Sequence, residues 1–326
     1  MALGVEIPPG AMDQGKAVDL CVPRANPADP MSPELSVREA HKRRSLQPAP
    51  ALALPSASVV VTTYNSPRYL ELVLLGYARQ DCSDFEVVVA DDGSGPETAQ
   101  LVQRMRDGGF PVPLVHAWQE DRGFRQSRAL NLGALHARGR QLVFTDGDCV
   151  PPADFVSTHL GAAAPGTLVV GGHVRLDPAR TERVTPEAVR AGLHENLVTA
   201  GERCSLWWRH LQNLAYVATG ARRRPKILGL NCAVDRGTFL AVNGFDLRYE
   251  NNAKQDSDLR NRLRLAGARA RCIWHRSVVV HLHHGTHAGR HGWAGADAYY
   301  RRPDLAPRCE QGIRELAAET GLPLRG

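Results

Sequence analysis

The 326-residue sequence has no apolar run that approaches the roughly 20 residues a helix needs to span a membrane. Its first residues, Met1 to Glu6, also lack the basic and apolar regions of a signal peptide. A cytoplasmic location is therefore expected, and peripheral association with the inner face of the membrane is left open.

The sequence also lacks pairs of cysteines at metal-binding spacing. The seven cysteines are odd in number, scattered along the chain, and form no Cys-x-x-Cys motif. This argues against a zinc site or a disulfide framework and favours reduced thiols. The net charge of +6 is compatible with anionic ligands, but no nucleic-acid-binding motif accompanies it, so we expect no nucleic-acid partner.

Residues 1–54 are rich in proline and charge without sustained periodicity, which predicts a flexible leader. After them, β-branched runs alternate four times with helical patterns. This alternation predicts an α/β fold with a doubly wound, mostly parallel sheet, whose carboxyl strand ends share one ligand-binding edge. Strands are expected at residues 58–65, 85–90, 113–118 and 142–145, and helices from 67, at 97–106 and at 125–138.

Past residue 155 the patterns are less regular. Trp207 and Trp208 are expected in the core, with stacking against a sugar ring as the alternative. A basic cluster at 222–226 indicates a solvated loop, or else a site for a phosphate-bearing or lipid-linked acceptor at a membrane surface. Strands are expected at 168–174, 229–234 and 278–284, and helices at 186–199, 236–242, from 256 or 257 to 267, and at 307–320.

Two carboxylates follow the strand at 142–145. Asp146 and Asp148 are two positions apart, so in an extended strand they point the same way, and Gly147 between them permits a turn or a close ligand approach. Hard oxygen ligands of this kind suit Mg²⁺ or Mn²⁺, which in turn can hold a diphosphate. The alternative is a solvated turn after a strand.

Several segments in order resemble the nucleotide-sugar half of family 2 glycosyltransferases, which have the GT-A fold. They are residues 61–65, 89–94, 123–131 and 144–148. A later block, residues 231–234, 244–246 and 256–259, resembles the C-terminal part of the galactosyltransferase and chondroitin-polymerase type.

The resemblance implies a GT-A domain over residues 55–285, with a nucleotide-sugar half at 55–155 and an acceptor-binding, catalytic half at 156–285. Residues 286–326 would then be a C-terminal tail. It also implies a nucleotide-sugar donor, most simply a UDP-sugar, and a glycan or lipid-linked acceptor. The expected reaction is inverting transfer of the sugar to an acceptor hydroxyl.

Carried over residue by residue, the resemblance places Thr62, Tyr64 and Asn65 in the nucleotide pocket and Asp91 and Asp92 at the uracil or ribose. Arg128, on the expected helix at 125–138, could meet phosphates, with a solvated helix face as the alternative.

The same resemblance makes Asp146 and Asp148 the pair that holds Mn²⁺ or Mg²⁺, with Asp148 preferred as the direct ligand. A histidine from the end of the strand at 278–284 would complete the metal site, His281 being preferred and His284 second. Asp256 stands where the family keeps its catalytic base.

One departure concerns the acceptor side. The related enzymes usually carry Gly-Trp-Gly-x-Glu-Asp before the last helix, whereas this chain has Asn-Asn-Ala-Lys-Gln-Asp at 251–256, so Gln255 replaces a glutamate. Two alternatives therefore stay open. One is a catalytically weakened nucleotide-sugar-binding protein of the same fold. The other is a nucleotidyltransferase, although residues 62–67 lack its glycine-rich phosphate loop with a lysine.

Overall fold

The computed structural model describes residues 54–221, 225, 229–250, 254–285 and 295–325. The leader expected at 1–54, except Leu54, lies outside the described residues. So do most of the basic cluster at 222–226, residues 251–253 of the departing stretch, and the start of the expected tail.

A seven-stranded sheet forms the centre, in the order β3-β2-β1-β4-β8-β6-β9. Only β8 runs antiparallel to its neighbours, so the other six strands share one direction. The predicted α/β fold with a mostly parallel sheet is confirmed. The strands are β1 (Ala57–Thr63), β2 (Phe85–Asp91), β3 (Leu114–Trp118), β4 (Gln141–Asp146), β6 (Thr167–Val170), β8 (Cys232–Asp235) and β9 (Arg269–Cys272).

The strand register places the chemically interesting residues at one edge. Strands β1 and β2 are buried throughout and rich in valine, which suits a parallel strand covered on both faces. Thr63 lies opposite Asp91, and Thr62 lies opposite Asp146. Three strands therefore deliver polar side chains to the same carboxyl edge.

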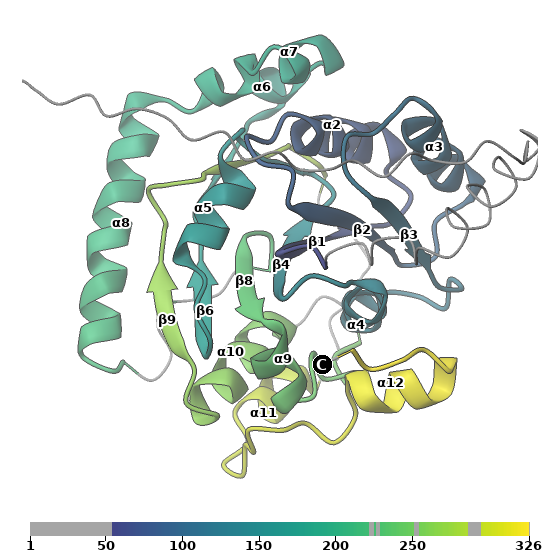
Figure 1. The fold of residues 1–326 in the computed structure, drawn as a ribbon. Coiled ribbons are helices and arrows are strands. Elements are labelled where there is room, and N and C mark those ends of the chain that lie inside the picture. The colour runs from purple at the N-terminus through teal and green to yellow at the C-terminus, as the bar shows by residue number, and fades with distance from the viewer. Residues whose placement is uncertain (1–53, 222–224, 226–228, 251–253, 286–294, 326) are drawn as a thin grey trace, which may run out of the picture. The chain divides into compact units, whose positions relative to one another are not determined.

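Helices cover both faces of this half of the sheet (Figure 1). Helices α2 (Pro67–Ala78) and α3 (Pro96–Asp107) lie on one side and each begins at a proline, which is well placed in a first turn. Helix α4 (Gln126–His136) packs on the other side against β1, β2 and β3. Its Gly133 permits that contact, since a Cβ there would come within 2.7 Å of a Val60 methyl group.

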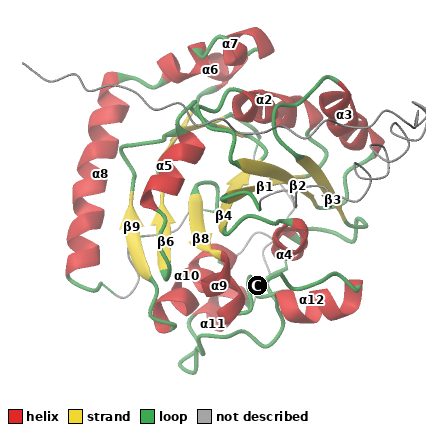
Figure 2. Cartoon of the chain, in the orientation of Figure 1, coloured by secondary structure: helices red, strands yellow, loops and turns green. Residues whose placement is uncertain are grey.

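The remaining helices come after β4 in the sequence (Figure 2). Helix α12 (Ile313–Thr320), in the segment expected to be a tail, packs against α4 with Ile313 and Leu316 buried. The others are α5 (Phe155–Ala162), α6 (Pro178–Glu182), α7 (Pro186–Arg190), α8 (Ala200–Ala218), α9 (Arg236–Ala241), α10 (Gln255–Leu265) and α11 (Ala296–Tyr300).

A second, three-stranded sheet joins distant parts of the chain beside the end of β4. Its strands are β5 (Cys149–Val150), β10 (Val279–His281) and β7 (His173–Arg175), with β10 in the middle. His281 lies opposite Cys149 on one side and Arg175 on the other. The backbone N–H of Leu282 also donates to the carbonyl of Asp148, at 2.9 Å. This small sheet therefore fixes the histidine-bearing strand beside the carboxylate pair.

Two predictions for the middle of the chain are wrong. The strand expected at 168–174 is divided into β6 and β7 at Gly171 and Gly172, where the chain leaves one sheet for the other. The helix expected at 186–199 ends early because Gly192 adopts a left-handed φ of 76°. A short 3-10 helix, η1 (Leu193–Leu197), follows it.

The long helix α8 was not expected. It begins after Thr199, which forms a capping box with Glu202. It lies beside β9 at the opposite edge of the sheet from β3 (Figure 1). Trp207 and Trp208, expected in the core, are 46% and 63% exposed on it. Among the described residues, no helix combines the length and the apolar character needed to cross a membrane.

Candidate functional site

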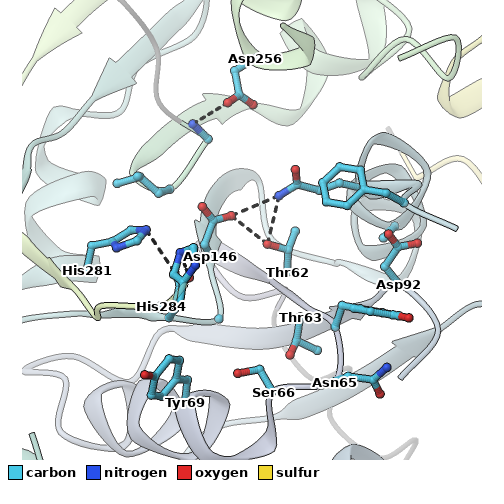
Figure 3. Close-up of a pocket in the computed structure, with 18 of the residues that line it drawn as sticks. Thr62, Thr63, Asn65, Ser66, Tyr69, Asp92, Asp146, Asp256, His281 and His284 are labelled. Atoms are coloured by element: carbon cyan, nitrogen blue, oxygen red, sulfur yellow. Dashed lines mark hydrogen bonds and ion pairs between the residues drawn. The ribbon is translucent and has the colours of Figure 1, made fainter. Parts of the chain in front are cut away.

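A pocket of about 460 Å³ opens at the carboxyl edge of the central sheet (Figure 3). Its lining comes from the loop after β1, the end of β4, the end of β10 and the first turn of α10. The structure therefore brings together residues that lie more than 190 positions apart in the sequence. The expected site residues that line it are Thr62, Tyr64, Asn65, Asp92, Asp146, Asp148, Asp256, His281 and His284.

Asp91 is not brought into the pocket. Its side chain is fully buried, and its carboxylate accepts a hydrogen bond from the Ser94 backbone N–H at 2.8 Å and pairs with His116 at 2.8 Å. These contacts hold the turn after β2 and the neighbouring strand β3. Asp91 is the last residue of β2 and pairs with neighbouring strands on both sides, whereas Asp92 follows the strand, which explains the difference between them.

Arg128 does not line the pocket either. Its guanidinium donates to Gln119 at 2.9 Å and forms an ion pair with Glu319 at the end of α12. The C-terminal helix therefore occupies the side of α4 from which a phosphate contact was expected.

The loop after β1 forms one wall. Asn65 has a left-handed φ of 46°, which asparagine tolerates better than most residues, and its side-chain oxygen accepts from Gly95 N–H at 2.9 Å. Thr63 lines this pocket, and its hydroxyl oxygen is buried with no hydrogen-bond partner within the described residues. A ligand hydroxyl or phosphate would satisfy it.

Asp92 forms the rim beside this wall. Its two carboxylate oxygens accept hydrogen bonds from the Gln119 side chain and from the Arg125 backbone N–H, the latter at 2.8 Å. Burial raises the pKa of Asp92, while these donors lower it. Asp92 thus anchors the chain that leads into α4.

The carboxylate pair sits at the end of β4. The strand ends at Asp146, so Asp148 belongs to the turn that follows and not to the same extended strand. Gly147 is required by the protein itself, because a Cβ there would come within 2.6 Å of the Thr62 carbonyl oxygen. The turn still brings oxygens of Asp146 and Asp148 within 4.8 Å of each other.

Asp146 is held in place before any ligand arrives. Its Oδ1 accepts from the Thr62 hydroxyl at 2.8 Å and from the Gln126 amide at 3.3 Å. The pKa of Asp146 is raised to about 7, first by burial and then by the negative charge of Asp148, against the hydrogen bond from Thr62. A bound cation would offset the charge that causes this penalty.

Asp148 faces two imidazoles. Its oxygens lie 3.7 Å from His281 Nε2 and 3.2 Å from His284 Nε2, and one ligand atom from each side chain can be chosen so that all lie within 4.8 Å of one another. Burial lowers the pKa of His281, which favours the neutral form that binds metals. This donor set of a carboxylate and two imidazoles fits a divalent cation.

Cys149 lies in a second group with the two carboxylates but is a poor candidate ligand. Burial raises the pKa of its thiol well above the usual range, with Asp148 and Asp146 adding to the effect. The protonated thiol lies 3.4 Å from an oxygen of Asp148, to which it donates. A metal ligand would need the thiolate.

Asp256 lies in the first turn of α10, across Asp146 from Asn65 in Figure 3. The residue before the helix is Lys254, with a left-handed φ of 60°, so the expected cap at 256 or 257 is displaced. Asp256 accepts from the Gly229 backbone N–H at 3.0 Å. Burial raises its pKa to about 6, which gives a carboxylate that can take up and release a proton near neutral pH.

Comparison with known families adds to this geometry. The model of the family described as glycosyl transferase family 2 matches residues 58–224, just over half of the chain. The chain belongs to glycosyl transferase family 2. The resemblance found in the sequence is confirmed, and the sheet described above is the GT-A arrangement that it implied.

Individual relatives of this family 2 chain match in part. Validoxylamine A glucosyltransferase from Streptomyces hygroscopicus subsp. jinggangensis is 30% identical over 226 residues, 66% of this chain and 52% of its own length. Chondroitin synthase from Escherichia coli is 28% identical over 124 residues, 37% of this chain and 18% of its own. The chain thus spans about half the length of the first relative.

Among solved structures, the mannosyltransferase PcManGT from Pyrobaculum calidifontis, in complex with GDP-Man and Mn²⁺, is similar. It is 23% identical, with a TM-score of 0.49, over 78% of this chain and 66% of that one.

Three side chains of this family 2 site were not expected from the sequence. Gln126, on the first turn of α4, contacts Asp146 and accepts at 2.9 Å from Gln255, the residue that replaces the family's glutamate. The unpartnered Thr63 hydroxyl and Arg175, from β7, also line the pocket. Thr63 and Gln126 adjoin expected site residues in the sequence, whereas Arg175 reaches the pocket only through the pairing of β7 with β10.

Proposed function

We propose that this chain transfers a sugar from a UDP-sugar to a hydroxyl of a glycan or glycoconjugate, with inversion and with a divalent cation. The observation that carries this proposal is that one pocket combines three sets of groups. It holds a polar wall after β1, the Asp148–His281–His284 group, and the carboxylate of Asp256. A donor, a cation and an acceptor hydroxyl each have a matching part of that pocket.

The nucleotide is assigned to the wall formed by Thr62, Thr63, Tyr64, Asn65 and Asp92. The unpartnered Thr63 hydroxyl and the Asp92 carboxylate can bond to the base or ribose. The rings of Tyr64 and Phe124 both line the pocket, and aromatic faces are suited to stacking with a base.

The cation is assigned to Asp148, His281 and His284, with Asp146 beside them. When bound, it would stabilise the negative charge that develops on the leaving diphosphate. Imidazole nitrogens among the ligands favour Mn²⁺ over Mg²⁺, which prefers oxygen ligands and retained water. Thr62 and Gln126 orient the Asp146 carboxylate through hydrogen bonds at 2.8 and 3.3 Å.

Asp256 is assigned as the general base. It accepts the proton of the acceptor hydroxyl as that oxygen forms its bond to the anomeric carbon and the bond to the nucleoside diphosphate breaks. A direct displacement of this kind inverts the anomeric centre. The pKa of about 6, raised by burial, keeps Asp256 ionised at neutral pH yet basic enough to take the proton.

The two alternatives are less well supported. A nucleotide-sugar-binding protein without catalytic activity has no need of a buried carboxylate with a raised pKa in the same pocket as the metal-binding group. Asp256 is such a carboxylate. For a nucleotidyltransferase, the loop after β1 would need a lysine-bearing phosphate loop, and it carries Asn65 and Ser66 in that place.

Calorimetric titration with UDP, with and without Mn²⁺, tests the proposal. Wild-type protein should bind UDP at least tenfold more tightly with Mn²⁺, and Asp148→Ala should lose that gain because the carboxylate that faces both imidazoles is removed. Asp304→Ala, which removes an exposed carboxylate outside the pocket, is the matched control. The absence of UDP binding in either condition would contradict the proposed function.

We also propose peripheral association of α8 with a membrane. Along its solvent-facing side, Cys204, Trp207, Trp208, Leu211 and Leu214 recur at three- and four-residue spacing and form an apolar stripe. Arg203 and Arg209 are exposed beside the stripe, while the helix's single carboxylate, Glu202, is paired with Arg180. Tryptophan with arginine suits the interface of an anionic bilayer.

Co-sedimentation with vesicles tests this association. Wild-type protein should bind phosphatidylglycerol-containing vesicles more strongly than pure phosphatidylcholine vesicles, and the double variant Trp207→Ser/Trp208→Ser should lose binding. Trp118→Ser is the matched control, because Trp118 is 49% exposed at the far edge of the sheet. If the stripe instead mediates self-association, light scattering will show a dimer that the double variant abolishes, and the membrane assignment is wrong.

A further inference from the structure

A second cavity, of about 250 Å³, lies between β7 and α8. His173 and Arg175 line it from β7, and Ser205 and Arg209 line it from α8. Arg175 also lines the larger pocket, so one side chain is shared by the two cavities. We call this space the β7–α8 cavity.

The β7–α8 cavity adjoins the proposed reaction centre on one particular side. Arg175 lies opposite His281, a proposed metal ligand, in the pairing of β7 with β10. Figure 3 shows His281 on the other side of Asp146 from Asp92 and Asn65, where the nucleoside is assigned. The cavity therefore extends away from the nucleoside, in a direction open to an acceptor.

Positive charge in the cavity is not compensated. Within the described residues, neither Arg175 nor Arg209 forms an ion pair or a side-chain hydrogen bond. The carboxylate that also lines the cavity, Glu202, is already taken up. Arg180 donates to both of its oxygens at 2.9 Å, and Thr199 donates to one of them. Two guanidinium groups thus face a cavity without an available protein anion.

A buried nitrogen strengthens this point. Nδ1 of His173 is shielded from solvent and has no hydrogen-bond partner among the described residues. The lining of the cavity thus includes a residue with an unsatisfied buried polar atom beside the two guanidinium groups.

We infer that the β7–α8 cavity binds an anionic group, a phosphate or a carboxylate, carried by the sugar acceptor. Guanidinium groups present paired N–H donors that match either anion, and the Ser205 hydroxyl adds a further donor. The acceptor is then an anionic glycan or glycoconjugate, whose charged group is held by Arg175 and Arg209 while its hydroxyl faces Asp256. This inference rests on the proposed function and names its substrate class.

Calorimetry with small probes tests the inference. sn-Glycerol 3-phosphate and glucuronate carry the two candidate anions, and glycerol and glucose are their neutral counterparts. Titrations into wild-type protein are made with UDP and Mn²⁺ at saturation, so that the larger pocket is filled. At least one anionic probe should bind, at least tenfold more tightly than its neutral counterpart, and the tighter of the two identifies the anion.

Variants of α8 locate the binding. Arg209→Gln should lower the affinity for the anionic probe at least tenfold. Arg209→Lys should recover part of the lost affinity because it restores the charge but not the paired donors. Arg203→Gln is the matched control, since Arg203 is exposed on the same helix and does not line the cavity. Affinity for UDP should be the same in the wild type and in all three variants.

Two results would overturn the inference. One is that neither anion binds better than its neutral counterpart, and the other is that Arg209→Gln leaves the affinity unchanged. Failure of UDP to bind would instead contradict the proposed function. In that case the dependence of probe binding on Arg209, measured without UDP, still decides whether the cavity holds an anion.

Discussion

The two sides of the pocket are built differently. On the β1–β4 side, nearly every polar group already has a protein partner: Thr62 holds Asp146, Gly95 holds the Asn65 side chain, and Arg125 holds Asp92. On the side of β7 and α10, Asp256 has a backbone partner at Gly229, and the Arg175 guanidinium has none within the described residues.

This difference separates a preorganised side from one that a ligand completes. Groups fixed before binding lose no freedom when the donor arrives, which suits chemistry shared across a family. Unpaired groups on the other side gain partners only from a particular acceptor, so that side is the natural place for specificity. The replacement of glutamate by Gln255 falls on this second side.

The largest effect is expected from Asp256, the group on the open side that acts on the acceptor. Asp256→Asn keeps an oxygen that can accept from Gly229 but cannot take a proton. We expect kcat to fall about 10²- to 10⁴-fold, the range typical of a general base, while UDP affinity stays within about twofold. The measurement is UDP release from whichever UDP-sugar a donor panel identifies.

A matched change outside the pocket, Asp304→Asn, should leave kcat unaltered. Turnover of Asp256→Asn within a few-fold of wild type would mean that the base lies elsewhere, and the assignment of the open side to the acceptor would fail with it.

Asp258 sharpens the comparison because it lies two residues from Asp256 on the same helix. It is fully buried, with Arg262 at 2.6 Å, and it also contacts Tyr249 and Arg302, each at 3.2 Å. Asp258→Ala leaves the buried Arg262 guanidinium without its counter-charge, which should lower the free energy of unfolding by about 3–5 kcal/mol. Urea denaturation followed by circular dichroism measures this.

The control is Asp256→Asn, which should unfold at the same or a higher urea concentration at pH 8. Burial raises the pKa of Asp256 above its unfolded value, so the ionised carboxylate opposes folding above that pKa, and asparagine removes the penalty. If both variants were destabilised equally, Asp256 would be a structural residue like its neighbour.

The same contrast explains what could be read from the sequence. The β1–β4 side follows from local patterns, since each strand ends in its own polar residues and parallel strands deliver them to one edge. Thr62, Asn65, Asp92, Asp146 and Asp148 follow from these patterns and do line the pocket, as does Asp256, which was expected from the family resemblance. The exceptions are Asp91 and Arg128, whose partners His116 and Glu319 come from β3 and α12.

The other side depends on distant pairings. Arg175 enters the site because β7 pairs with β10, more than 100 residues later, and nothing local marks it. Helix α8 was not expected, since Gly192 and η1 interrupt the helical pattern just before Thr199. Its adjacent tryptophans predicted a core, whereas the apolar stripe that carries them faces solvent.

A pH profile gives the next effect in size. Because the base must be ionised, kcat/KM should be constant above the Asp256 pKa of about 6 and fall about tenfold per pH unit below it. Binding of UDP, measured at saturating Mn²⁺ over the same range, shows whether the donor side contributes to the fall. If the residual activity of Asp256→Asn shows the same fall in kcat/KM at low pH, the fall is caused by the titration of another group.

The smallest effect is expected where the two sides meet. Gln255, from α10, donates to Gln126 at 2.9 Å, and Gln126 in turn donates to Asp146 at 3.3 Å. Since Thr62 still holds Asp146 at 2.8 Å, Gln126→Ala removes only a supporting hydrogen bond and should weaken Mn²⁺-dependent UDP binding about two- to tenfold.

Gln255→Ala should weaken UDP binding less than Gln126→Ala, because Gln255 reaches Asp146 only through Gln126. In the double variant the loss should equal that of Gln126→Ala alone, since the first change already breaks the connection. Calorimetry on the four proteins completes this cycle. If the two single variants lose UDP affinity independently and the losses add in the double variant, Gln255 contacts the donor by itself. Helix α10 would then belong to the donor side of the pocket.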